Sequence, residues 1–136
     1  MRFFIKNIIF LLIFSYILPD SKTTINIWHQ MLYENRKVLR EVCDKYEKNN
    51  SDVKISLTYR ETEELRSSYQ SAAMGGSGPE LIYGPSDQVG PFSTMKIIQP
   101  LDNLMPDAYF SQFVSNAIVK SDEKIWMIGD VVGNHL

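Results

Sequence analysis

The chain has 136 residues, of which 44% are hydrophobic and 22% are charged, and its formal net charge is -2. This length is enough for one domain with a buried core, but it is short for a protein with two lobes. Lys and Arg are interspersed with Asp and Glu, so no basic field is available for nucleic acid, and a nucleic-acid-binding function is disfavoured.

The first 21 residues have the pattern of a secretory signal peptide. Arg2 and Lys6 precede an apolar run over residues 8–18, which Pro19 ends. The run is shorter than the roughly 20 apolar residues that span a bilayer. We therefore expect residues 1–21 to be a leader, cut after Ser21, that exports the protein to the periplasm or the extracellular space. An uncleaved leader that anchors the protein in the membrane is the alternative.

A strand, a helix and a second strand are predicted next. Residues 25–28 alternate apolar and polar side chains, as do residues 53–59, and this alternation is typical of strands. Residues 35–48 place apolar side chains at helical spacing and charged ones on the other face, which predicts a helix that packs on a sheet. The apolar positions of this helix are Val38, Leu39, Val42, Cys43 and Tyr46. Cys43, the single cysteine, is expected to be a small buried hydrophobe.

A second helix and a third strand follow. Thr62-Glu63-Glu64 provides a cap and an acidic first turn, and Gly75, Gly76 and Gly78 provide left-handed backbone that ends the helix. Its inward positions are predicted to be Leu65, Tyr69, Ala72 and Ala73. Residues 80–84 then predict a short buried strand, with a turn at residues 84–87.

The remaining segments predict further elements of the same fold. Val89, Phe92 and Met95 indicate a short, broken helix, and residues 97–101 a short strand or turn. Residues 104–119 predict a pair of helices around Pro106, and residues 125–128 a last strand. Strands that alternate with helices predict an α/β fold with a mainly parallel sheet flanked by helices.

Few residues suit catalysis or metal binding. His29 and His135 are the only histidines, and no HExxH, CxxC, GxSxG or phosphate-binding glycine loop occurs. We therefore expect no enzymatic activity, no cofactor and no metal. A small secreted enzyme that uses His29 and Asp87 is the alternative from another class.

Binding chemistry fits the pattern better, because three predicted strand ends carry polar or aromatic groups. Ligands of open α/β sheets bind outside the carboxyl ends of the strands. Carboxylates and amides hydrogen-bond to sugar hydroxyls and aromatic rings stack on sugars. The side chains of these types are Trp28, Gln30, Glu64 and Asp87.

Residues 25–128 resemble the amino-terminal part of the extracellular solute-binding proteins of family 1, the maltose-binding-protein-like receptors of ABC sugar transporters. The resemblance is carried by INIWH (25–29), VLREVCDKYEKNNSDVKISLTY (38–59), SAAMGGSGPELIYGPSD (71–87) and MKIIQPLD (95–102). It implies a type II periplasmic-binding-protein-like fold. Residues 22–128 would form the first lobe, and residues 129–136 would begin the hinge or mark a truncated end.

The resemblance implies a monomeric receptor that binds a sugar or oligosaccharide and delivers it to membrane permease subunits. It assigns ligand contacts to His29, Gln30, Glu64, Ser86, Asp87 and Gln88, which with Trp28 complete the expected site. The chain departs from the family pattern at Gly84, where an aromatic residue is common, and near Gln88, where a basic group is common.

Because family members are much longer, we expect an incomplete first lobe that leaves apolar surface uncovered and that alone binds sugar weakly or not at all. Two other hypotheses stay open: a receptor for glycerol-phosphate or another polar solute, and a nonfunctional remnant.

Overall fold

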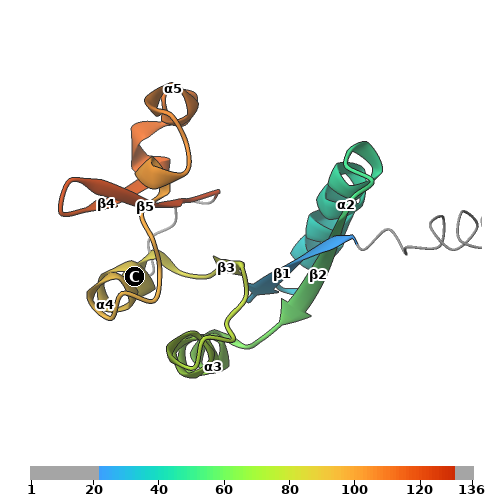
Figure 1. Cartoon of the computed structure of the whole chain (residues 1–136), viewed down its shortest axis with the longest axis horizontal. Coiled ribbons are helices and arrows are strands. Elements are labelled where there is room, and N and C mark those ends of the chain that lie inside the picture. Colours follow the sequence, from blue (N-terminus) through green and yellow to red (C-terminus); the bar gives the residue numbers. More distant parts are fainter. Residues whose placement is uncertain (1–21, 131–136) are drawn as a thin grey trace, which may run out of the picture.

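The computed structural model describes residues 22–130, so the predicted leader and residues 131–136 lie outside the described part. Three parallel strands form a sheet in the order β2-β1-β3 (Figure 1). They are β1 (Thr23–His29), β2 (Val53–Tyr59) and β3 (Leu81–Tyr83). Ile27 lies opposite Leu57 on one side and Leu81 on the other. The predicted α/β fold with a parallel sheet flanked by helices is confirmed.

Two long helices connect these strands. Helix α2 (Tyr33–Asn49) leads from β1 to β2, and α3 (Thr62–Met74) leads from β2 back across β1 to β3. The connection from β1 to β2 and the connection from β2 to β3 run in opposite directions across the sheet. Since both are expected to be right-handed, α2 and α3 lie on opposite faces of the sheet. Consecutive side chains of a strand also point to opposite faces. His29 accordingly lines a cavity with α2, and Trp28 lines one with α3.

The apolar stripe of α2 is only partly buried. Cys43 is 4% exposed, as predicted, but Val38, Val42 and Tyr46 are 59%, 60% and 48% exposed. The expectation that all five apolar positions pack inward is therefore wrong for these three. No element among residues 22–130 covers the side of α2 on which they lie, because the sheet contacts only the strip that contains Cys43.

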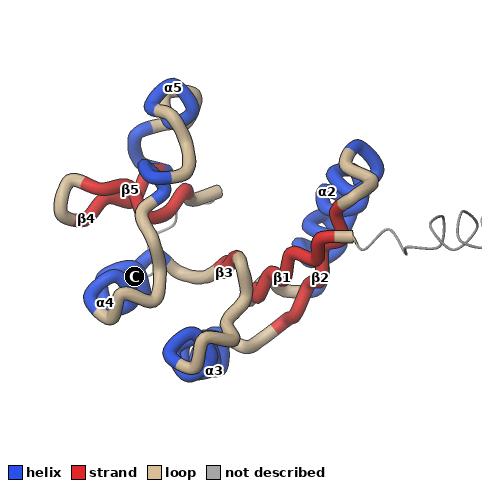
Figure 2. The backbone as a smooth tube through the Cα atoms, viewed as in Figure 1, coloured by secondary structure: helices blue, strands red, loops and turns tan. Residues whose placement is uncertain are grey.

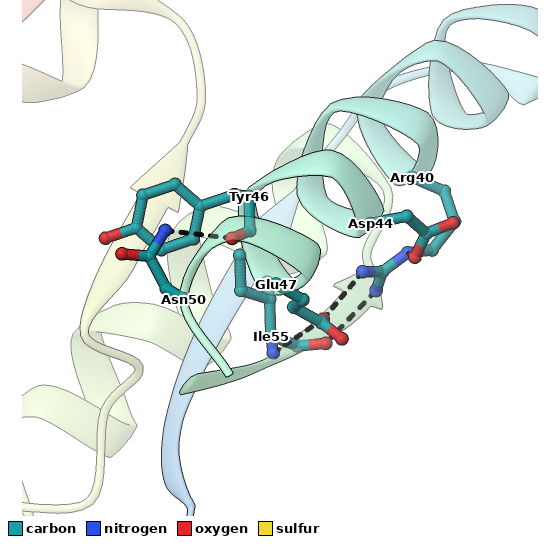
Figure 3. A network of polar contacts seen from close by, with 6 residues as sticks. All are labelled: Arg40, Asp44, Tyr46, Glu47, Asn50 and Ile55. Carbon is teal, nitrogen blue, oxygen red and sulfur yellow. Dashed lines mark hydrogen bonds and ion pairs between the residues drawn. The ribbon is translucent and has the colours of Figure 1, made fainter. Parts of the chain in front are cut away.

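Charged side chains of α2 bind the open edge of β2 (Figure 3). The carboxylate of Glu47 accepts a hydrogen bond from the backbone N–H of Ile55 at 2.8 Å. The guanidinium of Arg40 donates one to the backbone carbonyl oxygen of Ile55 at 3.1 Å. Arg40 also pairs with Asp44 at 2.7 Å and with Glu47 at 2.8 Å. The amide of Asn50 donates to the carbonyl of Tyr46 at the end of the helix. The outer backbone groups of this edge strand at Ile55 are thus satisfied by side chains.

Both ends of α3 differ in detail from the prediction. The residue that caps its start is Glu61, whose carboxylate accepts from the N–H of Glu63 at 3.0 Å, rather than Thr62. Of the predicted glycines, only Gly76 has left-handed backbone, with φ of 71°. Its N–H donates to Ala73, and the N–H of Ser77 donates to Ala72, so a Schellman motif ends the helix.

Strand β3 is an edge of the sheet, and the prediction that it is buried is wrong for Leu81, which is 54% exposed. The main core lies under α3 instead. Leu65 is fully buried, and the rings of Tyr69 and Phe92 lie 5.0 Å apart. The Tyr69 hydroxyl donates to the carbonyl of Ile97 at 2.6 Å. The predicted inward positions Leu65 and Tyr69 are confirmed, while the flanking Ala72 and Ala73 are half-buried.

The segment after β3 is less helical than predicted (Figure 2). Helix α4 (Val89–Thr94) agrees with the predicted short helix. Residues 97–100 form neither the predicted strand nor a turn, but an irregular segment with a bend at Ile98 that leads into a 3₁₀ helix at Leu101–Asn103. The predicted helical pair over residues 104–119 is wrong. This segment holds only α5 (Asp107–Phe110), a 3₁₀ turn and the start of a strand.

That strand, β4 (Ile118–Ser121), pairs antiparallel with β5 (Lys124–Ile128), which contains the predicted last strand. The turn residues Asp122 and Glu123 both have positive φ, 49° and 63°, as a two-residue hairpin of type I′ requires. The β-branched Ile118 and Val119 favour this strand over a helix. The hairpin is a separate two-stranded sheet, and it lies at the other end of the molecule from α2 (Figure 1).

Candidate functional site

The candidate site lies where the strand order reverses, at the carboxyl ends of β1 and β3. His29 is paired directly with Tyr83 and with Tyr59, so the ends of all three strands meet as predicted. Gln30 follows β1, and residues 84–88 follow β3. Because β1 and β3 are neighbours whose connections run in opposite directions, this edge is the topological switch point at which α/β proteins bind ligands.

Three predicted site residues present buried polar atoms here that have no hydrogen-bond partner among residues 22–130. They are Nδ1 of His29, Oε1 of Gln30, and both Oε1 and Nε2 of Gln88. His29 and Gln88 are only 1% and 4% exposed. Because buried polar groups are nearly always paired in native proteins, each of these atoms needs an explanation. Each of the two amides can donate and accept hydrogen bonds toward a polar molecule.

The imidazole of His29 is neutral at neutral pH. Burial lowers its pKa from the ordinary value of 6.5, and the nearby Arg36 lowers that pKa further. One ring nitrogen therefore donates a hydrogen bond and the other accepts one.

The two predicted carboxylates lie at the surface, and each is held by an arginine. Asp87 accepts from Arg66 at 3.3 Å, and Glu64 accepts from Arg60 at 2.6 Å. These arginines were not predicted from the sequence. Arg60 stands four residues before Glu64, a helical spacing that signals such a pair. Arg66 is distant from Asp87 in sequence, and only the folded structure brings them together.

Trp28 stands apart from the unpaired amides. The guanidinium of Arg60 lies 4.1 Å from the centre of its ring, so one face of the indole is covered by a cation. The ring lines a shallow cavity with Ser67, Ser68 and Ser71 of α3. The seven expected contacts thus form two groups. His29, Gln30, Ser86, Asp87 and Gln88 lie at the ends of β1 and β3, while Trp28 and Glu64 are joined through Arg60 on the α3 side.

Gly84 shapes the position of Gln88. A Cβ atom at Gly84 would lie 3.3 Å from Oε1 of Gln88 and 3.3 Å from a methyl carbon of Leu65. A side chain at residue 84 would therefore crowd the buried amide of Gln88 and the side chain of Leu65, which would have to shift slightly. Gln88 lines a cavity of about 70 Å³ together with Phe92 and Trp126.

The described residues hold no group of three or more His, Cys, Asp or Glu side chains that could bind a metal ion. No helix within residues 22–130 is long and apolar enough to cross a membrane. Asp87 is paired with Arg66, whereas the ring of His29 lines a cavity on the α2 side. The described structure shows no hydrogen bond between His29 and Asp87, the pair that the enzyme alternative requires.

Comparison with known proteins gives consistent results. The chain is 60% identical to the maltose/maltodextrin-binding domain MalE of Bdellovibrio bacteriovorus bound to maltotriose, with a TM-score of 0.79 over 83% of this chain and 30% of that one. It is 25% identical over 91 residues to a maltotriose-binding protein of Pyrococcus abyssi, which covers 67% of this chain and 20% of that protein. The Thermus thermophilus maltotriose-binding protein shares the fold, with 18% identity and a TM-score of 0.67 over 75% of this chain and 28% of that one.

No family model matches the chain. All three relatives are named as binding proteins or domains rather than as enzymes. The chain spans 20% to 30% of the length of these relatives. The resemblance predicted from the sequence is confirmed, because most of this chain is similar to one part of maltose- and maltotriose-binding proteins.

Proposed function

We propose that this chain supplies one wall of the sugar-binding cleft in the substrate-binding component of an ABC importer. The observation that carries the proposal is the set of unpaired amide atoms of Gln30 and Gln88 at the switch point between β1 and β3. The hydroxyls of a sugar both donate and accept, so they complement amide groups, which also do both. The maltotriose bound to the Bdellovibrio relative makes an oligosaccharide of this type the first ligand to test.

Asp87 would add a carboxylate acceptor next to Gln88 in the chain, and Glu64 would add one on the α3 side. Each carboxylate is oriented by an arginine and stays exposed, so an oxygen remains available to a sugar hydroxyl. A residue range of 22–128 for the first lobe and delivery of the sugar to permease subunits belong to the same proposal. Export, directed by residues 1–21, would place the protein where such receptors meet their ligands.

The proposal is tested by nuclear magnetic resonance of the full chain during titration with maltotriose at millimolar concentration. This method detects the weak binding that we expect from a single wall. The expected result is a saturable shift of the signals of Gln30, Asp87 and Gln88. Asp87→Asn should reduce the affinity several-fold, because a hydrogen bond to a charged group contributes about 1.5–3 kcal/mol when fully formed.

Glu41→Gln is the matched control, because Glu41 is exposed on α2. It removes one carboxylate at a distance from the switch point, and it should leave the titration unchanged. Shifts that do not saturate, or that are equal in Asp87→Asn and the unaltered chain, would contradict the proposed site. Tight binding by the chain alone, at micromolar concentration, would contradict the view that one wall is insufficient.

A further inference from the structure

A second cavity lies on the opposite face of the sheet from the α3 side, between α2 and the end of β2. Its volume is about 360 Å³, and it is lined by cationic and aromatic side chains. The residues that line it are His29, Tyr33, Arg36, Lys37, Arg40, Leu57 and Tyr59. Lys37, Arg36 and Arg40 come from the first two turns of α2, and no carboxylate lines the cavity.

The charges of these three cations are balanced to different degrees. Arg40 is neutralised by Asp44 at 2.7 Å and by Glu47 at 2.8 Å. Lys37 lies 3.6 Å from Glu34 at the surface. Within residues 22–130, Arg36 forms no ion pair, and its Nε atom is buried without a hydrogen-bond partner. Arg36 is therefore the uncompensated positive charge of the cavity.

The geometry of Arg36 is fixed by Tyr59. Its guanidinium carbon lies 4.0 Å from the centre of the Tyr59 ring, so the planar group is held by a cation–π contact. A stacked guanidinium keeps its N–H groups in the plane of the group, where they can bind two oxygens of one anion.

The second group is His29, whose neutral ring can donate from Nδ1 when that nitrogen carries the proton. Its side chain is 1% exposed, it lines the same cavity, and its Nδ1 has no partner in the described part of the chain. A buried imidazole nitrogen and a buried guanidinium nitrogen, both unpaired and both beside one cavity, are matched by a ligand that offers two acceptor oxygens.

We propose that this cavity binds a small oxyanion, a carboxylate or phosphate group, through the guanidinium of Arg36 and the imidazole of His29. His29 is among the sugar contacts predicted from the sequence, but the sugar site proposed above rests on Gln30, Asp87 and Gln88, none of which lines this cavity. The proposal does not depend on sugar binding, because the two sites are served by helices on opposite faces of the sheet.

The test is calorimetry of the full chain with sodium phosphate and, separately, sodium acetate, in chloride buffers of equal ionic strength. Saturable binding of either anion is the expected result. Arg36→Gln should weaken that binding by at least about tenfold, because it removes a charge-assisted pair of hydrogen bonds. Arg36→Lys keeps the positive charge but loses the planar guanidinium. Its affinity for the anion should therefore lie between that of the unaltered chain and that of Arg36→Gln.

Lys45→Gln is the matched control. It removes one positive charge from the same helix, and Lys45 does not line the cavity. Equal losses in Arg36→Gln and Lys45→Gln would show a general field effect and overturn the proposal, as would the absence of saturable binding by the unaltered chain. Far-UV circular dichroism verifies that each variant is folded.

A second measurement needs no substitution. The ring-nitrogen resonances of His29 should shift as phosphate is added, and unchanged resonances at saturating phosphate would contradict the site. Asp87→Asn should leave phosphate binding intact while it weakens maltotriose binding. If phosphate fails to bind while maltotriose still shifts Gln88, only the oxyanion site is wrong. If the reverse holds, only the sugar site is wrong.

Discussion

Replacement of Glu80 tests how the third strand is attached to the sheet. The pairing of β3 with β1 begins at Leu81, opposite Ile27. One position earlier, the backbone N–H of Asn26 donates to the carboxylate of Glu80 at 2.7 Å, and the side-chain amide of Asn26 donates to it at 3.0 Å. The carboxylate thus takes the place of a backbone carbonyl and extends the ladder by one residue.

The expected loss of stability in Glu80→Ala follows from these two hydrogen bonds. A hydrogen bond to a charged group contributes about 1.5–3 kcal/mol, but Glu80 is exposed, so solvent screens the charge and lets water replace the carboxylate. We expect Glu80→Ala to lower the free energy of unfolding by about 1–2 kcal/mol. Glu80→Gln should cost about half of that, because one acceptor oxygen remains.

The pH dependence gives a sharper test. The hydrogen bond from the backbone of Asn26 is the main cause that lowers the pKa of Glu80 below its ordinary value of 4.5. A lowered pKa in the folded state means that the ionised carboxylate stabilises the protein above about pH 4.5, and that this stability is lost as the pH falls through the lowered value. The difference between the unaltered chain and Glu80→Gln should therefore disappear on acidification.

The assay is urea unfolding followed by circular dichroism at pH 7 and at pH 3, with Glu41→Gln as the control for loss of an exposed charge. The midpoint of Glu80→Ala should fall by roughly 0.3 M or more at pH 7, given a denaturant slope of about 1–3 kcal/mol/M. If Glu80→Gln and Glu41→Gln unfold at the same urea concentration at pH 7, the carboxylate does not extend the ladder. The same conclusion follows if the Glu80→Gln deficit is as large at pH 3 as at pH 7.

Two further predictions concern the core and the backbone. Leu65→Ala should lower the free energy of unfolding by about 2–5 kcal/mol in the same urea assay, since Leu65 is fully buried. Leu104 is 55% exposed, so Leu104→Ala should change the free energy of unfolding by less than about 0.5 kcal/mol. Comparable losses in the two variants would refute the position of the core. Gly76→Ala should cost about 1–2 kcal/mol because Gly76 has a φ of 71°. Gly90→Ala, in helix α4 with no neighbouring atom within 4 Å of the added carbon, should instead stabilise the chain by up to about 1 kcal/mol. If both glycine variants lose stability, the left-handed backbone of Gly76 is not the reason why Gly76→Ala is destabilised.

The first half of the fold could be predicted because its signals are local. Alternation over Val53–Tyr59 and helical spacing after Tyr33 depend only on neighbouring residues, and both elements occur close to the predicted bounds. The segment over residues 104–119 was predicted wrongly because its apolar residues fit several periods at once. The end of this segment is a strand because Val119 pairs with Met127 across the turn at Asp122, and both of these partners lie beyond the segment itself.

The candidate site shows the same division. The position of Gln88 just after a strand could be read from the sequence, and with it the expectation of a polar group at the sheet edge. The burial of Gln88 could not be predicted, because only the fold brings Leu65 of α3 close to Gly84 and to the amide of Gln88. The sequence places Arg36 only on the charged face of a predicted helix. Its lack of an ion pair within residues 22–130 and its contact with the ring of Tyr59 become visible only in the structure, where Lys37 and Arg40 are both ion-paired.

The unpaired amides at the switch point and the exposed apolar stripe of α2 both lack contacts, but they need different partners. The amides of Gln30 and Gln88 lack hydrogen bonds, and a small polar ligand at the switch point can supply these. The exposed stripe of Val38, Val42 and Tyr46 on α2 lacks apolar contacts, which a sugar at that edge cannot supply. Because the two features share no residue, sugar binding should stabilise the first without reducing the exposure of the second. A maltotriose-dependent rise in stability would therefore report on the switch point alone.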